Sequence, residues 1–531
     1  MKLNKKKVIL LCIICVAIVL VAIYFIFQNK QQTSENTQQE MNYETEEMIT
    51  NIRLGISEFD SIQPLVTQNR EVIYLSQLIF EPLLTITQDS KIEPCLAKEW
   101  SKVGDKTYVI KLKENVVWQD GSSFTAADVE FTIQEIQQNK NSIYYENVSH
   151  IQSVTVVDNM TIRIELDQEI PFFEYNLIFP ILSAKQYENE NIQTSKAIPI
   201  GTGRYQISNI TSEKIELTKN EKWRDLTNEN FYIDKITVNL YETMGEAYND
   251  FKLGNIDFLN TTNNDLEQYI GTMGYGKKEY AGREYDYLAI NCEDSVLQYK
   301  EVRQAISYTI DQNKLVTTTL ENNAFASYFP LEENSYLVKD TLTATEVDTT
   351  KAREILEEAG WSYEYGIWQK EIDNTTKTIN ITLSVQNENE QRVLVANAIK
   401  EQLEAVGIKV EIEKITDTQY QNYLKNHEYE ILLTGIYTSL SPDISSFFST
   451  NNLANYSNEE ILKILQELNN ISQEELLQEK YKRIIEIYQE EVPYIGLYKS
   501  KNTVVYSTGL RGDVTPNNYN IYYHLSQWYR Q

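Results

Sequence analysis

The segment from Val116 to Ile133, VVWQDGSSFTAADVEFTI, holds acids, hydroxyls and a tryptophan close enough together to resemble a reaction site. Carboxylates and hydroxyls at short spacing are the groups that acid–base or nucleophilic chemistry uses. Local structure explains the same residues without a reaction. Asp120-Gly121 suits a tight turn, and Thr125 with Asp128 three positions later suits a capping box at a helix start. We therefore predict a strand end, a turn and a capped helix in this segment.

Catalytic motifs are missing from the rest of the sequence. It contains no nucleophile elbow, P-loop, HExxH motif or plausible Ser/His/Asp set, and only three histidines, His150, His427 and His524. With so few histidines, and no clustered His or Cys, a transition-metal site is also unsupported. We predict that the protein is not an enzyme, with no catalytic residue, no metal site and no cofactor.

The charge balance excludes one class of partner. The chain has 531 residues, enough for two or three domains, and 77 acids against 48 bases give a formal net charge of −29. An acidic surface repels phosphate backbones, so we expect no nucleic-acid partner. Cys95 and Cys292 form no CxxC motif, and free, partly buried thiols are favoured over a disulfide.

The N-terminus carries the signal of a membrane anchor. Lysines in a basic stub at 1–7 precede the apolar run VILLCIICVAIVLVAIYFIF at 8–27. About twenty apolar residues in a helix can span a bilayer, and the lysines predict a cytoplasmic N-terminus. A cleaved signal peptide, or a lipoprotein signal at Cys12 or Cys15, is the alternative, but no A-x-A site follows Phe27 and the residues before the cysteines are large. The polar segment at 28–48 reads as a flexible linker.

Strand and helix patterns alternate after the linker. NIRLGIS (51–57) reads as a strand, and EVIYLSQLIFEPLL has apolar residues at helical spacing until Pro82. Asp158-Asn159 reads as a hairpin turn, and RVLVANAIKEQLEAVG (392–407) as a helix that ends at Gly407 before a strand. This alternation indicates an α/β protein whose sheet is covered by helices.

Several motifs together resemble those of a known family. WQDGSSFTAADVEFT is similar to the W-x-D-G-x-x-F-T-A-x-D-V-x-F-T signature of the family 5 extracellular solute-binding proteins, the peptide- and nickel-binding receptors of ABC importers. Further matches in family order are IFEPLLT, EPCLAKEW, PIGTGRYQI, YKEVRQAISYTID, AREILEEAGW, AIKEQLEAVGIKVEI and EEVPYIGLYKSKNTVVY. The resemblance extends from Ile49 to the C-terminus.

The resemblance implies an α/β fold of the periplasmic-binding-protein type II class, a two-lobed clamp with an extra inserted subdomain, here preceded by one transmembrane helix. Lobe I would comprise 49–91, 197–283 and 500–531, the inserted subdomain 92–196, and lobe II 284–499. The hinges would fall at 284–291 and 497–505. The implied function is an extracytoplasmic receptor, anchored in the cytoplasmic membrane, that binds a small molecule or oligopeptide and serves ABC permease subunits.

The resemblance also points to ligand-binding positions. Peptide-binding members pair the ligand amine with an aspartate near a G-W-x-x-D-x-x-D-P motif, which corresponds here to GIYTSLSPD (435–443). The position of that aspartate falls on Thr438 or Ser439, so amine capture lacks its acid. Asp443 either substitutes for it or caps a helix that starts at Ile444. The candidate ligand-binding residues are Glu81, Arg204, Tyr285, Tyr287, Asn291, Tyr437, Ser439 and Asp443.

Packing is the alternative role for several candidates. Tyr285 and Tyr287 alternate on the expected hinge strand and would equally fill a core. Arg204 stands where relatives have proline in G-T-G-P-Y, as a ligand contact or in a solvated turn. Two alternative functions also remain open, a membrane-tethered sensory protein and a binding protein for a non-peptide ligand such as a sugar or a metal chelate held by arginine.

Overall fold

The computed structural model describes residues 50–262, 266–272, 274–344 and 346–530. The basic stub at 1–7, the predicted transmembrane helix at 8–27 and the linker at 28–48 lie outside these residues. Within the described ranges, no helix has the length and apolar character needed to cross a bilayer.

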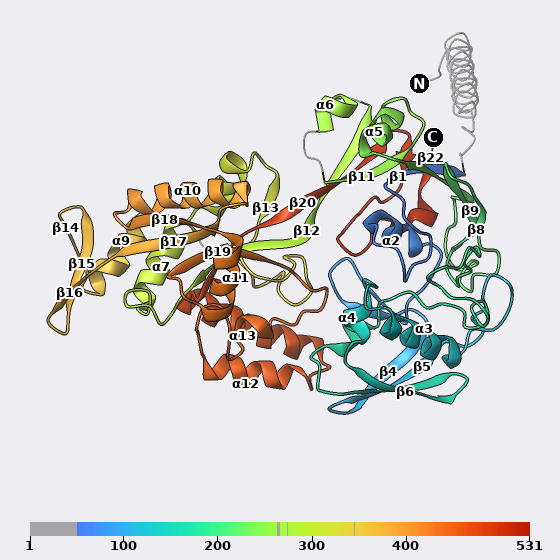
Figure 1. Ribbon diagram of the computed structural model, residues 1–531, viewed down its shortest axis with the longest axis horizontal. Coiled ribbons are helices and arrows are strands. Elements are labelled where there is room, and N and C mark those ends of the chain that lie inside the picture. Colours follow the sequence, from blue (N-terminus) through green and yellow to red (C-terminus); the bar gives the residue numbers. More distant parts are fainter. Residues whose placement is uncertain (1–49, 263–265, 273, 345, 531) are drawn as a thin grey trace, which may run out of the picture.

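One eleven-stranded sheet runs through both halves of the molecule (Figure 1). Its main path is β18-β17-β19-β12-β20-β11-β1-β10-β9-β8, and β13 pairs with β20. Lobe I contains β1 (Asn51–Ser57), β8 (Tyr205–Ile210), β9 (Lys214–Lys219), β10 (Lys235–Tyr241) and β11 (Phe258–Thr261). Lobe II contains β13 (Ala324–Ala326), β17 (Asn380–Gln386), β18 (Lys409–Ile415) and β19 (Ile431–Tyr437). The prediction of a two-lobed α/β fold is confirmed.

Two long antiparallel strands, β12 (Tyr275–Ile290) and β20 (Tyr494–Ser507), continue from one lobe into the other. Their pairing is interrupted midway, because Ala281 pairs with Lys501 whereas Tyr285 pairs with Lys499. Residues 282–284 of β12 therefore lie opposite Ser500 alone. A bulge of this kind bends a strand and locally weakens its ladder. It lies where the two lobes meet, so it is the natural place for the sheet to bend.

An antiparallel subdomain follows the first strands of lobe I in sequence. Its sheet, in the order β4-β5-β7-β6, consists of β4 (Ala97–Gly104), β5 (Thr107–Leu112), β6 (Ile151–Asp158) and β7 (Thr161–Leu166). The predicted turn at Asp158-Asn159 is confirmed as the β6–β7 connection. Other elements here are α3 (Ala126–Gln138), α4 (Tyr145–Val148), η2 (Phe173–Asn176) and β3 (Ile92–Pro94), which pairs with β2 (Leu84–Ile86) from the preceding part of lobe I.

The segment VVWQDGSSFTAADVEFTI forms the predicted turn and capped helix. The predicted strand end is wrong, because β5 ends at Leu112 and only an isolated bridge between Val117 and Ser123 follows it. Gly121 has a φ of +89°, and the Asp128 carboxylate accepts the Thr125 N–H at 2.8 Å at the start of α3. The same carboxylate also accepts the Ala184 N–H at 2.9 Å, which ties the helix start to a distant loop. Thr125 and Asp128 therefore have structural roles at the start of the helix.

Helices cover lobe II, and a three-stranded excursion extends from it (Figure 1). The helices are α7 (Lys300–Thr309), α8 (Gln312–Lys314), η3 (Leu315–Thr319), α9 (Thr349–Glu358), α10 (Glu390–Ala405), α11 (Asp417–Asn426), η4 (Ser445–Phe447), α12 (Glu459–Leu468) and α13 (Glu474–Glu491). The excursion is β14 (Ser362–Glu364), β15 (Ile367–Ile372) and β16 (Thr375–Thr378). The predicted helix ending at Gly407, with a strand after it, is confirmed by α10 and β18.

The remaining elements complete lobe I. They are α2 (Arg70–Ser76), α5 (Met244–Lys252), α6 (Leu266–Ile270), β21 (Leu510–Arg511), η5 (Leu525–Gln527) and β22 (Tyr529–Arg530). The helical pattern predicted to run up to Pro82 is wrong at its end, because α2 stops at Ser76. The backbone after it is held by another segment, since Gly203 N–H donates to Ile79 O at 2.8 Å. A Cβ at Gly203 would lie 2.7 Å from Ile79 O, so only glycine permits this approach.

Candidate functional site

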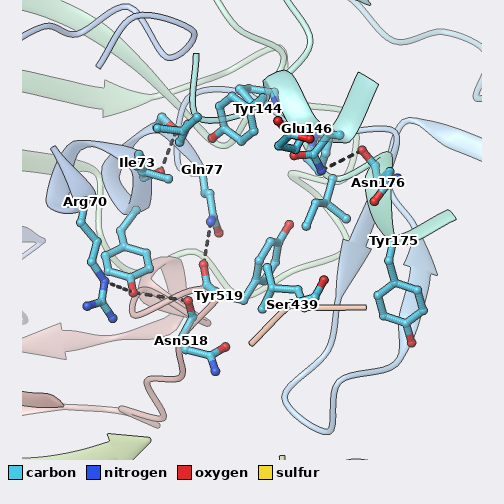
Figure 2. Close-up of a pocket in the computed structure, with 18 of the residues that line it drawn as sticks. Arg70, Ile73, Gln77, Tyr144, Glu146, Tyr175, Asn176, Ser439, Asn518 and Tyr519 are labelled. Carbon is cyan, nitrogen blue, oxygen red and sulfur yellow. Dashed lines mark hydrogen bonds between the residues drawn. The ribbon is translucent and has the colours of Figure 1, made fainter. Parts of the chain in front are cut away.

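A cavity of about 560 Å³ lies between the lobes (Figure 2). Lobe I supplies α2 and the C-terminal residues Asn518 and Tyr519, and the antiparallel subdomain supplies residues 143–147 and 175–180. The opposite wall comes from Arg283 in the β12 bulge, from Tyr437 at the end of β19 and from residues 439–441 after that strand. The volume is in the range of about 300–1,000 Å³ that is typical of small-molecule sites. Because both lobes line this cavity, its shape depends on how they are oriented.

Aromatic and amide side chains make up about half of the residues that line the cavity. The rings are those of Tyr74, Phe80, Tyr144, Tyr175, Tyr437 and Tyr519, and the amides are those of Gln68, Gln77, Asn147, Asn176 and Asn518. Some amides are already fixed by the protein, because Gln77 Nε2 donates to Tyr519 O at 2.8 Å and Asn147 Nδ2 donates to Asn176 O at 3.1 Å (Figure 2). Flat rings with amide groups between them suit an elongated ligand that carries hydrogen-bonding groups.

Two arginines line the cavity. Arg70 is the first residue of α2, and its Nε donates to Tyr74 Oη at 2.8 Å (Figure 2). Arg283 lies in the hinge bulge, and its Nε donates to Thr438 O at 2.7 Å while its guanidinium lies 4.4 Å from the centre of the Tyr437 ring. Burial lowers the pKa of Arg283, and the positive charge of Arg70 lowers it further, although both groups remain charged at physiological pH.

Thr438 is one of the two positions, with Ser439, where the resemblance places an aspartate. Its side chain is buried, and its N–H and Oγ1 donate to Arg283 O at 2.8 and 3.0 Å. Together with the bond from Arg283 Nε, these contacts fasten the residue-438 loop to the hinge strand. Thr438 thus has a defined structural role, and no carboxylate replaces the expected one at 438 or 439.

Of the predicted site residues, Tyr437 and Ser439 line the cavity. The Tyr437 side chain is exposed and stacks on Arg283. Ser439 is also exposed, and its Oγ accepts the Ser441 N–H at 3.0 Å. These two residues lie on the lobe II wall, Tyr437 as the last residue of β19 and Ser439 in the loop that follows.

Glu81 and Arg204 lie together in lobe I but do not line the cavity. The Glu81 carboxylate is buried and pairs with Arg224 Nη1 at 2.6 Å. Burial alone would raise the pKa of Glu81, but the Arg224 charge and hydrogen bond hold it below its ordinary value. Arg204 pairs with Glu229 at 2.9 Å and lies 4.5 Å from the centre of the Trp223 ring. Both side chains are therefore already satisfied by protein partners.

Tyr285, Tyr287 and Asn291 also lie away from the cavity lining. Tyr285 and Tyr287 are buried in the lobe II core, with their ring centres 5.4 Å apart. Asn291 Nδ2 donates to Tyr429 O at 3.0 Å at the far end of β12. These three residues of the hinge strand have packing roles in this structure.

Asp443 is the last of the predicted site residues, and it too lies outside the cavity lining. Its Oδ1 accepts the Ser445 N–H at 2.9 Å, at the start of η4. This bond corresponds to the capping alternative, although the helical turn starts one residue later than predicted.

Arg70 and Arg283 were not among the residues predicted from the sequence. Arg70 directly follows the helix-capping residue Asn69, whose Oδ1 accepts the Glu71 N–H at 2.8 Å. Arg283 directly precedes the expected hinge segment at 284–291. Neither arginine belongs to a recognisable motif, so only proximity to the predicted hinge could have drawn attention to one of them.

The structure describes no group of three or more His, Cys, Asp or Glu side chains that could hold a metal ion. Cys95 and Cys292 are free and partly buried, which confirms the prediction for these thiols. Burial raises the pKa of Cys95 to about 12 and that of Cys292 to about 11.

Comparison with known proteins connects these features to a family. The family model described as "Bacterial extracellular solute-binding proteins, family 5 Middle" matches residues 91–458. The chain is 22% identical to the oligopeptide-binding protein AppA of Bacillus subtilis over 77% of this chain and 78% of AppA. It is 24% identical to the heme-binding protein A of Haemophilus influenzae over 85% of this chain and 87% of that protein.

Solved structures show the same fold. The structure titled as a nickel ABC transporter from Bacillus halodurans has a TM-score of 0.76 with 20% sequence identity, covering 91% of this chain and 100% of that one. At this level of identity the similarity shows the fold and leaves the ligand open.

Proposed function

The chain belongs to the bacterial extracellular solute-binding proteins, family 5, and from this membership we propose that it binds a peptide-like ligand between its lobes as the receptor of an ABC importer. The observation that carries the proposal is the composite wall of the cavity, to which lobe I, the antiparallel subdomain, the hinge and lobe II all contribute. Rings and amides in this wall suit a peptide backbone and its side chains.

Domain closure is the proposed output of binding. Contacts between the lobes are present in this structure, because Asn334 Nδ2 donates to Gln88 O at 2.9 Å and Lys102 Nζ donates to Asn469 O at 3.1 Å. A ligand that touches both walls has its full set of contacts only when the lobes are together. It therefore shifts an open–closed equilibrium that permease subunits can sense.

We place the boundaries at the hinge strands, in agreement with the sequence expectation. Lobe I then comprises 49–91, 197–283 and 500–531, the inserted subdomain 92–196 and lobe II 284–499. The β12 bulge at 282–284 and its partner Ser500 support these limits, because the pairing changes register there. The segment at 8–27 would tether the receptor to the membrane, with the permease as its partner there.

Native mass spectrometry of the fragment starting at Ile49 tests the ligand class. After denaturation, released molecules are identified, and recovery of short peptides is expected. A Ser439→Trp variant, which fills the cavity from an exposed position, should release none, while Ser439→Ala should retain them. Recovery of a heme, a sugar or a metal chelate from the parent fragment, with no peptide, would refute the peptide-like ligand.

A non-peptide anion is the second candidate, because the cavity contains two arginines and its lining includes one acid, the exposed Glu146. A metal chelate with free carboxylates would suit such a lining. The same mass spectrometry distinguishes the two candidates.

A further inference from the structure

Arg70 and Arg283 differ from the other shielded arginines of the protein. Six other arginines are half-buried or buried, and each has a carboxylate oxygen within 4.0 Å: Arg53, Arg204, Arg224, Arg303, Arg392 and Arg530. Arg70 and Arg283 are half-buried as well, but no described carboxylate lies within that distance of either. Both unpaired side chains line the cavity between the lobes.

Part of each guanidinium remains available for a ligand. Arg70 uses Nε for Tyr74 Oη and Nη1 for Asn502 Oδ1, the latter at 3.4 Å, and its Nη2 has no acceptor in the described part of the chain. Arg283 uses Nε for Thr438 O, and both of its Nη atoms are without an acceptor among the described residues. A planar fork of N–H groups matches the two oxygens of a carboxylate.

The side chains that line the cavity carry a net positive charge, whereas the protein as a whole is strongly acidic. The chain carries a formal net charge of −29, yet the side chains that line its cavity include two guanidiniums and one carboxylate, that of the exposed Glu146. Glu71 and Glu332 lie outside the lining and act on Arg70 and Arg283 only from beyond ion-pair distance. Thr438 and Ser439 add no acid. Half-buried cations of like sign repel one another, and an anion from outside the chain would relieve that repulsion.

We propose that the ligand presents a carboxylate that binds between Arg70 and Arg283, and that the cleft does not require a free amine. The inference rests on the proposed receptor function and specifies its ligand. It also gives the carboxylate a mechanical role. Arg70 belongs to lobe I, while Arg283 is fastened to the lobe II loop through Thr438. A carboxylate between them links the two walls and favours the closed form.

Matched peptides test the proposal on the fragment that starts at Ile49. Calorimetry would compare tetra-alanine in its free, N-acetylated and C-terminally amidated forms, with citrate as a non-peptide carboxylate. We expect N-acetylation to change Kd by less than about threefold, and amidation to weaken binding by at least about thirtyfold, because only amidation removes the carboxylate.

Variants locate the effect. Arg70→Gln and Arg283→Gln should each weaken the free acid by at least about tenfold and leave the amide unaffected, since one fork is lost in each case. Arg70→Lys and Arg283→Lys keep the positive charge but lose the planar guanidinium, so their Kd for the free acid should lie between those of the parent and the Gln variants. Arg353→Gln, on an exposed face of α9, is the matched control and should bind as the parent does. Melting curves of every variant establish that it is folded.

The outcomes separate this inference from the proposed function. Equal binding of the amide and the acid would overturn the carboxylate site while leaving the peptide receptor intact. Binding of citrate but of no peptide, with loss in both Gln variants, would support the carboxylate site and overturn the peptide-like ligand. No binding of either the acid peptide or citrate would overturn the carboxylate site, and mass spectrometry would then decide the function alone.

Discussion

Two regions of the molecule hold half-buried arginines in contrasting ways. In lobe I, Arg224 pairs with the buried Glu81 at 2.6 Å, so the charge is neutralised within the protein. In the cavity, Arg70 and Arg283 have no described carboxylate partner and lie close enough for one to lower the pKa of the other. The first arrangement stabilises the fold, and the second leaves binding capacity for a ligand. The same side-chain type thus serves structure or recognition according to whether the chain supplies the counter-charge.

Removing Glu81 should have the largest effect on stability. Glu81→Gln removes the buried partner of Arg224 and leaves it only the more exposed Asp225, 3.3 Å from its Nε. Breaking a buried pair costs about 3–5 kcal/mol, so we expect a loss near the lower end of that range. Urea unfolding of the fragment starting at Ile49 measures this loss. Glu229→Gln is the control, because it breaks a more exposed pair with Arg204 and should cost no more than about 1 kcal/mol. If both variants lost the same free energy of unfolding, the buried pair would be no more important for stability than the exposed pair.

A carboxylate introduced into the cavity should pair with an arginine there, as Glu81 pairs with Arg224 in lobe I. Ser439→Asp places a carboxylate beside Thr438, whose carbonyl accepts from Arg283. We expect binding of a carboxylate ligand to weaken about tenfold, or about 1.4 kcal/mol, because the new acid competes for the guanidinium. Calorimetry with the tetra-alanine free acid measures it, and Ser439→Asn is the uncharged control. Stronger binding of the acid in Ser439→Asp would contradict the idea.

Removing an arginine without a carboxylate partner should change the stability of the ligand-free protein little. Arg70→Gln loses hydrogen bonds to Tyr74 and Asn502 but breaks no described ion pair, so the free energy of unfolding should fall by no more than about 1 kcal/mol. Arg53→Gln provides the comparison, because Arg53 Nη2 lies 2.7 Å from the buried Asp257 and its loss leaves that acid with a weaker partner. A large loss in Arg70→Gln would show that Arg70 is structural.

The smallest expected effect concerns the Cys95 thiol, which should be unreactive in the folded protein. Its Sγ lies 3.8 Å from Glu81 Oε1. Burial raises the pKa of its thiol to about 12, and the Glu81 charge adds to the increase. The thiolate is the reactive form, so at pH 8 Cys95 should resist a thiol reagent in the folded protein and react once urea unfolds it. Cys95→Ser identifies its signal, and rapid labelling of the native fragment would show that this region opens readily.

Local sequence predicted those elements whose causes are local. The capped helix after Thr125, the turn at Asp158-Asn159 and the strand β1 follow from hydrogen bonds and alternation within a few residues. The end of α2 was not predictable in this way. It depends on the backbone of Gly203, more than a hundred residues later, which occupies the space beside Ile79.

The candidate site was predicted only in part for a similar reason. The loop after β19 was found from its motif, and Tyr437 and Ser439 do line the cavity. Tyr285 and Tyr287 alternate along a strand, and alternation cannot reveal which face meets the cleft and which meets the core. Glu81 could not be recognised as satisfied, because its partner Arg224 is distant in the sequence.

The sequence by itself determined the family, the α/β alternation and the absence of an acid at 438 and 439, because motifs, periodicity and residue types are local properties. Only the tertiary structure decided which charges are neutralised. Arg224 and Arg70 are indistinguishable as letters, and the fold brings a carboxylate to the first and an open cavity to the second. Pairing depends on through-space distance, and that distance exists only once the lobes have formed.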